Sequence, residues 1–230
     1  MRRLVTVLGC VLAALPWAGP AAAAHSVTLG GVSVRLTDRT GQVVTVNRTR
    51  GYHAVVSWWI RTDSGWERQL RSRDGRVGYG GLVLARKRKQ GTGTTPLGTF
   101  RLPWAFGTHR RQDAWMIRYR RIKRGDYWVQ DNRSAYYNRY RNRSAGGFRW
   151  WLPGSDPNSS ERLKDYPRQY EWAVVTSFNK SQVKHRGSGI FLHVNGPGAT
   201  GGCVSAPRRL IRRLMRRLDP AQRPVIAVGR

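Results

Sequence analysis

The sequence predicts a mainly β fold with one amphipathic helix near the C-terminus, docked on the sheet. Short runs rich in valine, threonine and aromatic residues recur from residue 27 to residue 101, and such runs are typical of strands. Helical spacing of apolar residues is clear only after residue 205. The 10 tryptophans argue against a disordered chain, because disordered chains contain few aromatic residues.

The first 24 residues read as a secretory signal peptide. Two arginines precede an apolar run over residues 4–15, and small residues follow up to Ala24. The apolar run is too short for a membrane-spanning helix. We therefore expect an exported, extracytoplasmic protein, either wall-associated or secreted, that starts at His25 and has no transmembrane segment. Residues 25–230 contain no linker or repeat, which predicts a single domain.

The chain is strongly basic, with 42 lysine and arginine residues against 12 acidic residues and a formal net charge of +30. A basic surface favours an anionic partner, most often nucleic acid. Export directs the prediction to anionic polymers of the cell envelope instead, and no nucleic-acid partner is expected.

The predicted strands follow one another from the N-terminal end. Alternation indicates strands within residues 27–36, and β-branched and aromatic residues indicate strands at 42–46 and 53–60. Asp63-Ser64-Gly65 supplies a hairpin turn before the strand at 66–70. Residues 78–103 then hold two short extended runs, separated by a glycine-rich loop and Thr95-Pro96.

Residues 104–151 interleave aromatic residues with arginines and have no clean period. One interpretation is a long irregular excursion that buries its aromatic rings and leaves its arginines in water. The other is a surface that flanks a substrate, because such side chains stack on sugar faces and bind carboxylate or phosphate. Both interpretations stay open.

Two further segments predict buried strands. The apolar run at 170–179 suits a central strand covered on both faces. The run "GIFLHVN" at 189–195 alternates, so that His193 shares the more open face of its strand with Phe191 and Asn195. Val194 points to the other face, into the core.

The segment "SAPRRLIRRLMRRLDP" predicts the helix. Its apolar residues recur at helical spacing, with arginines at the complementary positions. Ser205 is positioned to cap it, Pro207 suits its first turn, and Asp219-Pro220 ends it. A helix on a membrane surface fits the same pattern. The strand-like run at 223–229 that follows favours a helix docked on a sheet.

The lone cysteine of residues 25–230, Cys203, lies ten positions after His193. A lone exported thiol is either an inert buried side chain or a nucleophile. A nucleophilic thiol needs a cation, an imidazole or a helix start nearby, and the sequence offers all three around Cys203. Gly201 and Gly202 leave the backbone bare, so the N–H groups of Gly202 and Cys203 are candidate oxyanion donors.

Competing chemistries find no support in the sequence. No spacing of histidine, cysteine or acidic residues suits a metal site, and no GxSxG elbow, phosphate loop or dinucleotide fingerprint occurs. We therefore predict no metal and no cofactor.

Two motifs, "GTGTTPLGTFRLP" and "GIFLHVNGPGATGGCVSAP", resemble the L,D-transpeptidase catalytic domain of the YkuD type, and look most like an exported actinobacterial-type branch. The resemblance implies a β-sandwich and an enzyme that acts on peptidoglycan stem peptides. It implies that Cys203 is the nucleophile, forming an acyl-enzyme from a tetrapeptide stem with release of D-alanine, and that His193 is the base. It further implies that the carbonyl of Val194 orients the imidazole.

The chain departs from the family pattern at two positions. Gly201 stands where most members have histidine, and Ser205 where asparagine is common, whereas Thr200, Gly202 and Cys203 fit. The first departure bears on acceptor choice and transfer rate. Two alternatives stay open: an L,D-carboxypeptidase, which hydrolyses without cross-linking, and a non-catalytic basic module that binds the envelope.

Overall fold

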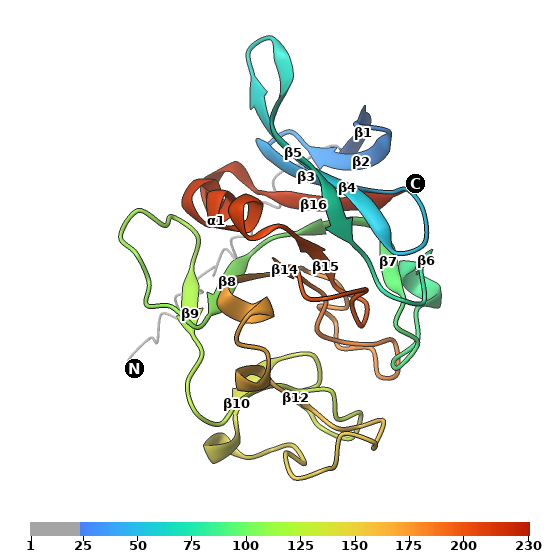
Figure 1. Cartoon of the computed structure of the whole chain (residues 1–230), viewed down its shortest axis with the longest axis vertical. Helices are drawn as coiled ribbons and strands as arrows, with labels where there is room; N and C mark the ends of the chain where they lie inside the picture. Colours follow the sequence, from blue (N-terminus) through green and yellow to red (C-terminus); the bar gives the residue numbers. More distant parts are fainter. Residues whose placement is uncertain (1–23) are drawn as a thin grey trace, which may run out of the picture.

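An eleven-stranded mixed sheet organises the computed structural model, which describes residues 24–230 (Figure 1). In spatial order its strands are β6 (Leu82–Leu84), β7 (Thr95–Arg101), β16 (Val225–Gly229), β3 (Gln42–Arg48), β4 (His53–Thr62), β5 (Gly65–Arg76), β15 (Val204–Ala206), β14 (Phe191–Val194), β13 (Ala173–Val175), β8 (Trp104–Gly107) and β9 (Tyr119–Arg121).

Two small sheets and a few helices complete the described part of the chain. The hairpin of β1 (Ala24–Leu29) and β2 (Val32–Thr37) lies at one end of the molecule, and the sheet of β11 (Tyr140–Asn142), β10 (Asp126–Trp128) and β12 (Glu161–Arg162) lies at the other (Figure 1). The helices are α1 (Arg208–Arg217) and the 3-10 turns η1 (Ala85–Lys87), η2 (Arg143–Ala145), η3 (Leu163–Asp165), η4 (Gln169–Glu171) and η5 (Pro220–Gln222).

Strand β16 shows how the sandwich is built. Val225 and Ala227 pack into the cluster under the β1–β2 hairpin, whereas Ile226 and Val228 pack into the main core with α1. Alternate residues of one strand therefore serve two layers. The predicted fold class, a mainly β YkuD-like sandwich with a C-terminal helix on the sheet, is confirmed.

The helix docks through its apolar face, as predicted. The arginines of the helix are exposed, and its four apolar residues are buried. These are Leu210, Ile211, Leu214 and Met215. The predicted cap at Ser205 is wrong. Val204–Ala206 forms β15, and the Ser205 hydroxyl donates to Oδ1 of Asn195 at 2.7 Å, so the helix begins after Pro207 without a side-chain cap.

The central strand expected at 170–179 is shorter than predicted. Only Ala173–Val175 is extended, but it lies between β14 and β8 and is buried throughout. The strands predicted within residues 27–70 are present as β1 to β5.

Residues 104–151 are more ordered than predicted and contain β8 to β11. Several aromatic side chains of this segment are buried: Trp104 in part, and Phe106, Trp115, Tyr127, Trp128, Tyr137 and Phe148 fully. Some arginines lie on aromatic rings, as Arg141 does 3.4 Å from the Tyr136 ring centroid. The burial of these rings agrees with the first interpretation, whereas the strands and the stacked arginines do not.

The predicted signal peptide lies outside the described residues, apart from Ala24. In residues 24–230 no helix has the length and apolar character to cross a membrane.

Replacing Leu214 by alanine should lower the free energy of unfolding by about 2–5 kcal/mol, because it leaves a cavity between α1 and the sheet. The exposed neighbour Arg213, replaced by alanine, should change it by no more than about 0.5 kcal/mol. Denaturant unfolding of both variants measures the difference, and equal losses would contradict the docking of the helix.

Candidate active site

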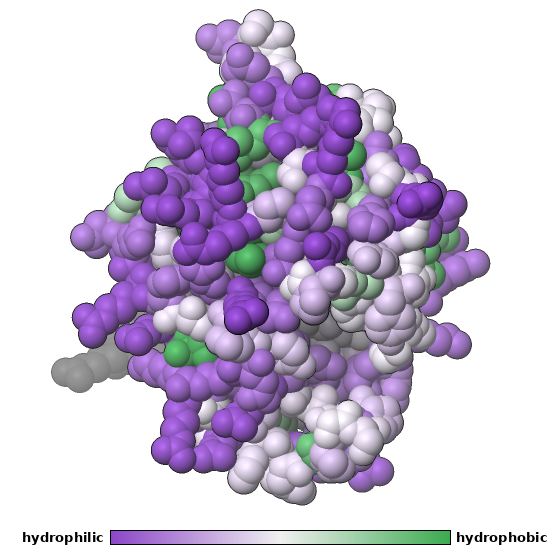
Figure 2. Space-filling model, in the orientation of Figure 1, coloured by the Kyte–Doolittle hydropathy of each residue, from purple (hydrophilic) through white to green (hydrophobic). Residues whose placement is uncertain are grey.

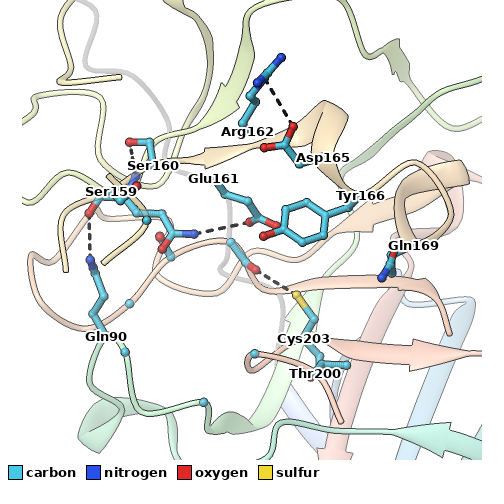
Figure 3. A pocket seen from close by; sticks show the side chains of 18 of the residues that line it. Gln90, Ser159, Ser160, Glu161, Arg162, Asp165, Tyr166, Gln169, Thr200 and Cys203 are labelled. Atoms are coloured by element: carbon cyan, nitrogen blue, oxygen red, sulfur yellow. Dashed lines mark hydrogen bonds and ion pairs between the residues drawn. The ribbon is translucent and has the colours of Figure 1, made fainter. Parts of the chain in front are cut away.

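A cavity of about 940 Å³ lies where the ends of β14 and β15 meet the small sheet of β10 to β12 (Figure 3). Both predicted functional side chains, Cys203 and His193, line it. Tyr127, Gln130 and Trp150 also line it, so part of the arginine-aromatic segment borders the cavity.

Parallel pairing of β14 with β15 brings the histidine and the cysteine together. His193 pairs with Ser205, and the connection runs through residues 195–203. Parallel neighbours usually need a connection of about a dozen residues or more. Here the connection is shorter, and its loop is held against β5, because the guanidinium of Arg76 donates to the carbonyls of Gly196 and Gly198.

Two threonines fix the backbone of Cys203. Its carbonyl accepts hydrogen bonds from Oγ1 of Thr200 at 2.6 Å and from Oγ1 of Thr95 at 3.3 Å. The Thr95 hydroxyl also accepts the N–H of Gly78 at 2.8 Å. Thr95 and Cys203 are 108 positions apart, so their hydrogen bond brings the two sequence motifs together at the nucleophile candidate.

The thiol of Cys203 is buried and protonated. It donates to the carbonyl of Gly189 at 3.1 Å (Figure 3) and accepts the N–H of Phe191 at 3.4 Å. Burial raises the pKa of Cys203 to about 12, with a further rise from the charge of Glu161. The positive charge of Arg88 opposes this rise. The sequence had instead predicted that the start of the helix and its arginines would lower the pKa of the thiol, but the helix begins only after β15.

The imidazole of His193 is neutral and held in one orientation. Its Nδ1 lies 2.8 Å from the carbonyl oxygen of Val194, and because a carbonyl only accepts, Nδ1 carries the proton and Nε2 a lone pair. Burial lowers the pKa of His193 to about 4. The ring packs edge-on against Tyr170, and only 6% of the residue is exposed, so the expected open face is a cavity wall.

At rest the Cys203 thiol and the His193 ring share a cavity but are not hydrogen-bonded to each other. The described residues include no hydrogen bond between the Cys203 thiol and the His193 ring. The pair is therefore a neutral thiol and a neutral base on one cavity, not a preformed thiolate–imidazolium pair.

The glycines before Cys203 differ from one another. Gly202 has φ +128°. Its N–H, one of the two predicted oxyanion donors, is occupied by a hydrogen bond to Oγ1 of Thr200 at 3.2 Å, so the second predicted donor, the N–H of Cys203, is the one that stays available. Gly201 is exposed on the cavity, and a Cβ there would meet nothing within 4 Å. An alanine at position 201 would therefore fit without moving the backbone.

Two charged residues that line the cavity, Glu161 and Arg88, were not predicted from the sequence. Glu161 points into the cavity (Figure 3), accepts the hydroxyl of Tyr170 and the amide of Gln130, and has its pKa raised to about 7 by burial. Arg88 is buried in the cavity wall. Glu161 follows a polar turn and Arg88 lies in the basic run "ARKRK", and both settings are typical of surface residues.

A family model, described as the L,D-transpeptidase catalytic domain (YkuD), matches residues 41–226. The chain belongs to the YkuD family. Searches of curated proteins and of solved structures found no match. This YkuD domain thus carries the fold of an enzyme family that acts on peptidoglycan peptides. Within residues 24–230, no three His, Cys, Asp or Glu side chains gather as a metal site would require.

Alkylation of Cys203 by iodoacetamide should be slow at pH 7 and should rise steadily to pH 10 without a plateau. The thiolate is the reactive form, and a pKa of about 12 leaves little of it over this range. Peptide mapping by mass spectrometry, which separates Cys203 from Cys10, measures the rate. A plateau near neutral pH would reveal a preformed thiolate.

Alanine at the two neighbouring glycines should have unequal effects. Gly202→Ala should cost at least about 1–3 kcal/mol of unfolding free energy, because its φ is strained for other residues and its Cβ would lie 2.8 Å from the Thr94 carbonyl oxygen. Gly201→Ala should stay within about 0.5 kcal/mol. Equal unfolding midpoints in denaturant would refute this account of the loop.

Proposed function

We propose that this chain is a cysteine-dependent peptidoglycan L,D-transpeptidase that cross-links tetrapeptide stems through an acyl-enzyme. The observation that carries the proposal is the placement of Cys203 and His193 on one cavity of a YkuD domain, with Nδ1 of the histidine fixed by the Val194 carbonyl. That arrangement supplies a nucleophile, a base with its lone pair free, and a group that orients the base.

In the first half-reaction, Sγ of Cys203 attacks the carbonyl that precedes D-alanine while its proton passes to Nε2 of His193. The Val194 carbonyl stabilises the imidazolium through Nδ1–H. The amide of Cys203, joined by that of Gly202 when Thr200 releases it, stabilises the oxyanion. The C–N bond then breaks, His193 returns the proton to the leaving amine, and D-alanine departs from a thioester.

In the second half-reaction, a side-chain amine of a neighbouring stem attacks the thioester. His193 accepts the amine proton and returns it to the Cys203 sulfur as the thioester bond breaks. Water in place of the amine would give the carboxypeptidase reaction, with a tripeptide as product.

Gly201 bears on the second half-reaction. Where most members of the family have an imidazole, this cavity has open space in contact with solvent. The acceptor amine therefore depends on His193 and on the remaining cavity wall. At position 205, where asparagine is common in the family, this chain has a serine. The Ser205 hydroxyl donates to the side chain of Asn195, so Asn195 supplies an amide group next to this position.

We infer an extracytoplasmic location, at the cell wall or secreted, as the signal peptide predicts, and membership of the exported actinobacterial-type branch. The net charge of +30 supports association with anionic envelope polymers. Hydrophilic side chains cover much of the face that carries α1 and the β4–β5 hairpin (Figure 2). Stem peptides are the substrate partners.

The test is intact mass spectrometry of the purified chain incubated with a disaccharide-tetrapeptide, beside Cys203→Ala. The native protein should gain the mass of the donor minus D-alanine and produce dimeric muropeptide, and the variant should do neither while keeping its circular dichroism spectrum. Free tripeptide without dimer would replace the transpeptidase by the carboxypeptidase. No adduct and no turnover from folded native protein would overturn the enzyme assignment in favour of an envelope-binding module.

A further inference from the structure

Arg88 is the only arginine that is buried among the described residues, with 6% of its surface exposed. It follows η1, and its guanidinium is held by backbone carbonyls: Nε donates to Thr94 at 2.7 Å and Nη1 to Arg186 at 3.2 Å. The guanidinium carbon also lies 5.5 Å from the centroid of the Phe178 ring. The side chain is therefore fixed in place.

No carboxylate of residues 24–230 forms an ion pair with this guanidinium. The buried Asp131, by contrast, is paired with Arg149 at 2.6 Å. Burial lowers the pKa of Arg88, and the groups that counter this are the thiol of Cys203 and two phenols. A buried cation without an anion is unfavourable, so the molecule keeps a charge that it does not itself neutralise.

The guanidinium lies beside Gly202, the residue that precedes the nucleophile candidate. A Cβ on Gly202 would lie 2.7 Å from Nη2 of Arg88, and one on Gly187 would lie 1.5 Å from Nη1. Nη2 has no hydrogen-bond acceptor among the described residues, and Arg88 lines the same cavity as Cys203. The free donor is thus available to a bound molecule.

Ser188 provides a second, independent observation. It follows Gly187, lines the cavity, and is 7% exposed, yet its Oγ has no hydrogen-bond partner. Leaving a buried hydroxyl without a hydrogen bond is unfavourable, because the group has lost its contact with water. The cavity wall therefore holds a buried cation and a buried hydroxyl whose hydrogen-bonding capacity is unused.

We propose that Arg88 and Ser188 bind the terminal carboxylate of the donor peptide, on the residue that leaves when Cys203 is acylated. This inference rests on the proposed function. Adjacent Cα atoms are about 3.8 Å apart, so a scissile carbonyl at Sγ of Cys203 puts the carboxylate of the next residue within reach of the guanidinium beside Gly202. The planar fork of arginine matches a carboxylate.

The pair then sets donor specificity. A donor that ends in a free carboxylate one residue beyond the scissile bond neutralises Arg88. A donor that is amidated there, or extended by a further residue, buries the guanidinium without a counter-charge and reacts slowly.

The experiment compares two donors, the disaccharide-tetrapeptide and the same compound with a C-terminal carboxamide. The rate of acyl-enzyme formation is followed by intact mass spectrometry of the full chain. The native protein should prefer the acid by at least about tenfold, as the loss of a charge-assisted hydrogen bond predicts. Arg88→Met should reduce the preference to about one, and Ser188→Ala should reduce it in part. The exposed Arg86, changed to methionine, is the matched control and should keep the native preference.

Equal rates for acid and amide in the native protein, or a native preference in folded Arg88→Met, would overturn the carboxylate site. If Arg88→Met does not fold, Arg88→Lys decides, because lysine keeps the charge but loses the fork: a reduced preference supports the site and a native one overturns it. Failure of the native protein to form an adduct with either donor would instead refute the proposed function.

Discussion

The parallel pairing of β14 with β15 is the constraint on which the site depends. It fixes His193 opposite Ser205 and leaves only residues 195–203 to return the chain from one strand to the start of the next. So short a return is possible because Arg76 and the end of β5 hold the loop from outside, and because Gly202 adopts a backbone conformation that other residues resist. The proposed base and the proposed nucleophile are therefore positioned by the sheet itself.

The surroundings of this pair come from distant parts of the chain. Thr95 reaches the Cys203 carbonyl from β7, Arg88 fixes the wall beside Gly202, and Glu161 approaches from the small sheet beyond the cavity. The cavity thus combines a cation and an acid in a protein whose surface is overwhelmingly basic. The general charge of the chain bears on what it adheres to, whereas these two groups of the cavity wall bear on what enters the cavity.

Local patterns predicted the strands, the helix and the histidine–cysteine pair, because alternation, helical spacing and a short sequence separation are local properties. They failed where tertiary pairing decides. Ser205 looked like a helix cap but is a strand residue because β14 pairs there, and the burial of His193 comes from Tyr170. Arg88 and Glu161 carry no local signal, since their place in the cavity wall results from the packing of segments that are distant in the sequence.

The protonated state of Cys203 protects its thiol from oxidation in an oxidising compartment, to which the predicted signal peptide would deliver the chain. Thiol–disulfide exchange requires an accessible thiolate, and oxidation to the sulfenic acid follows the same requirement. Cys203 is 8% exposed, and its protonated thiol, which donates to the Gly189 carbonyl, supplies little thiolate for either reaction. In the proposed enzyme, the same burial would delay activation of the thiol until substrate is bound and would keep the sulfur reduced between turnovers.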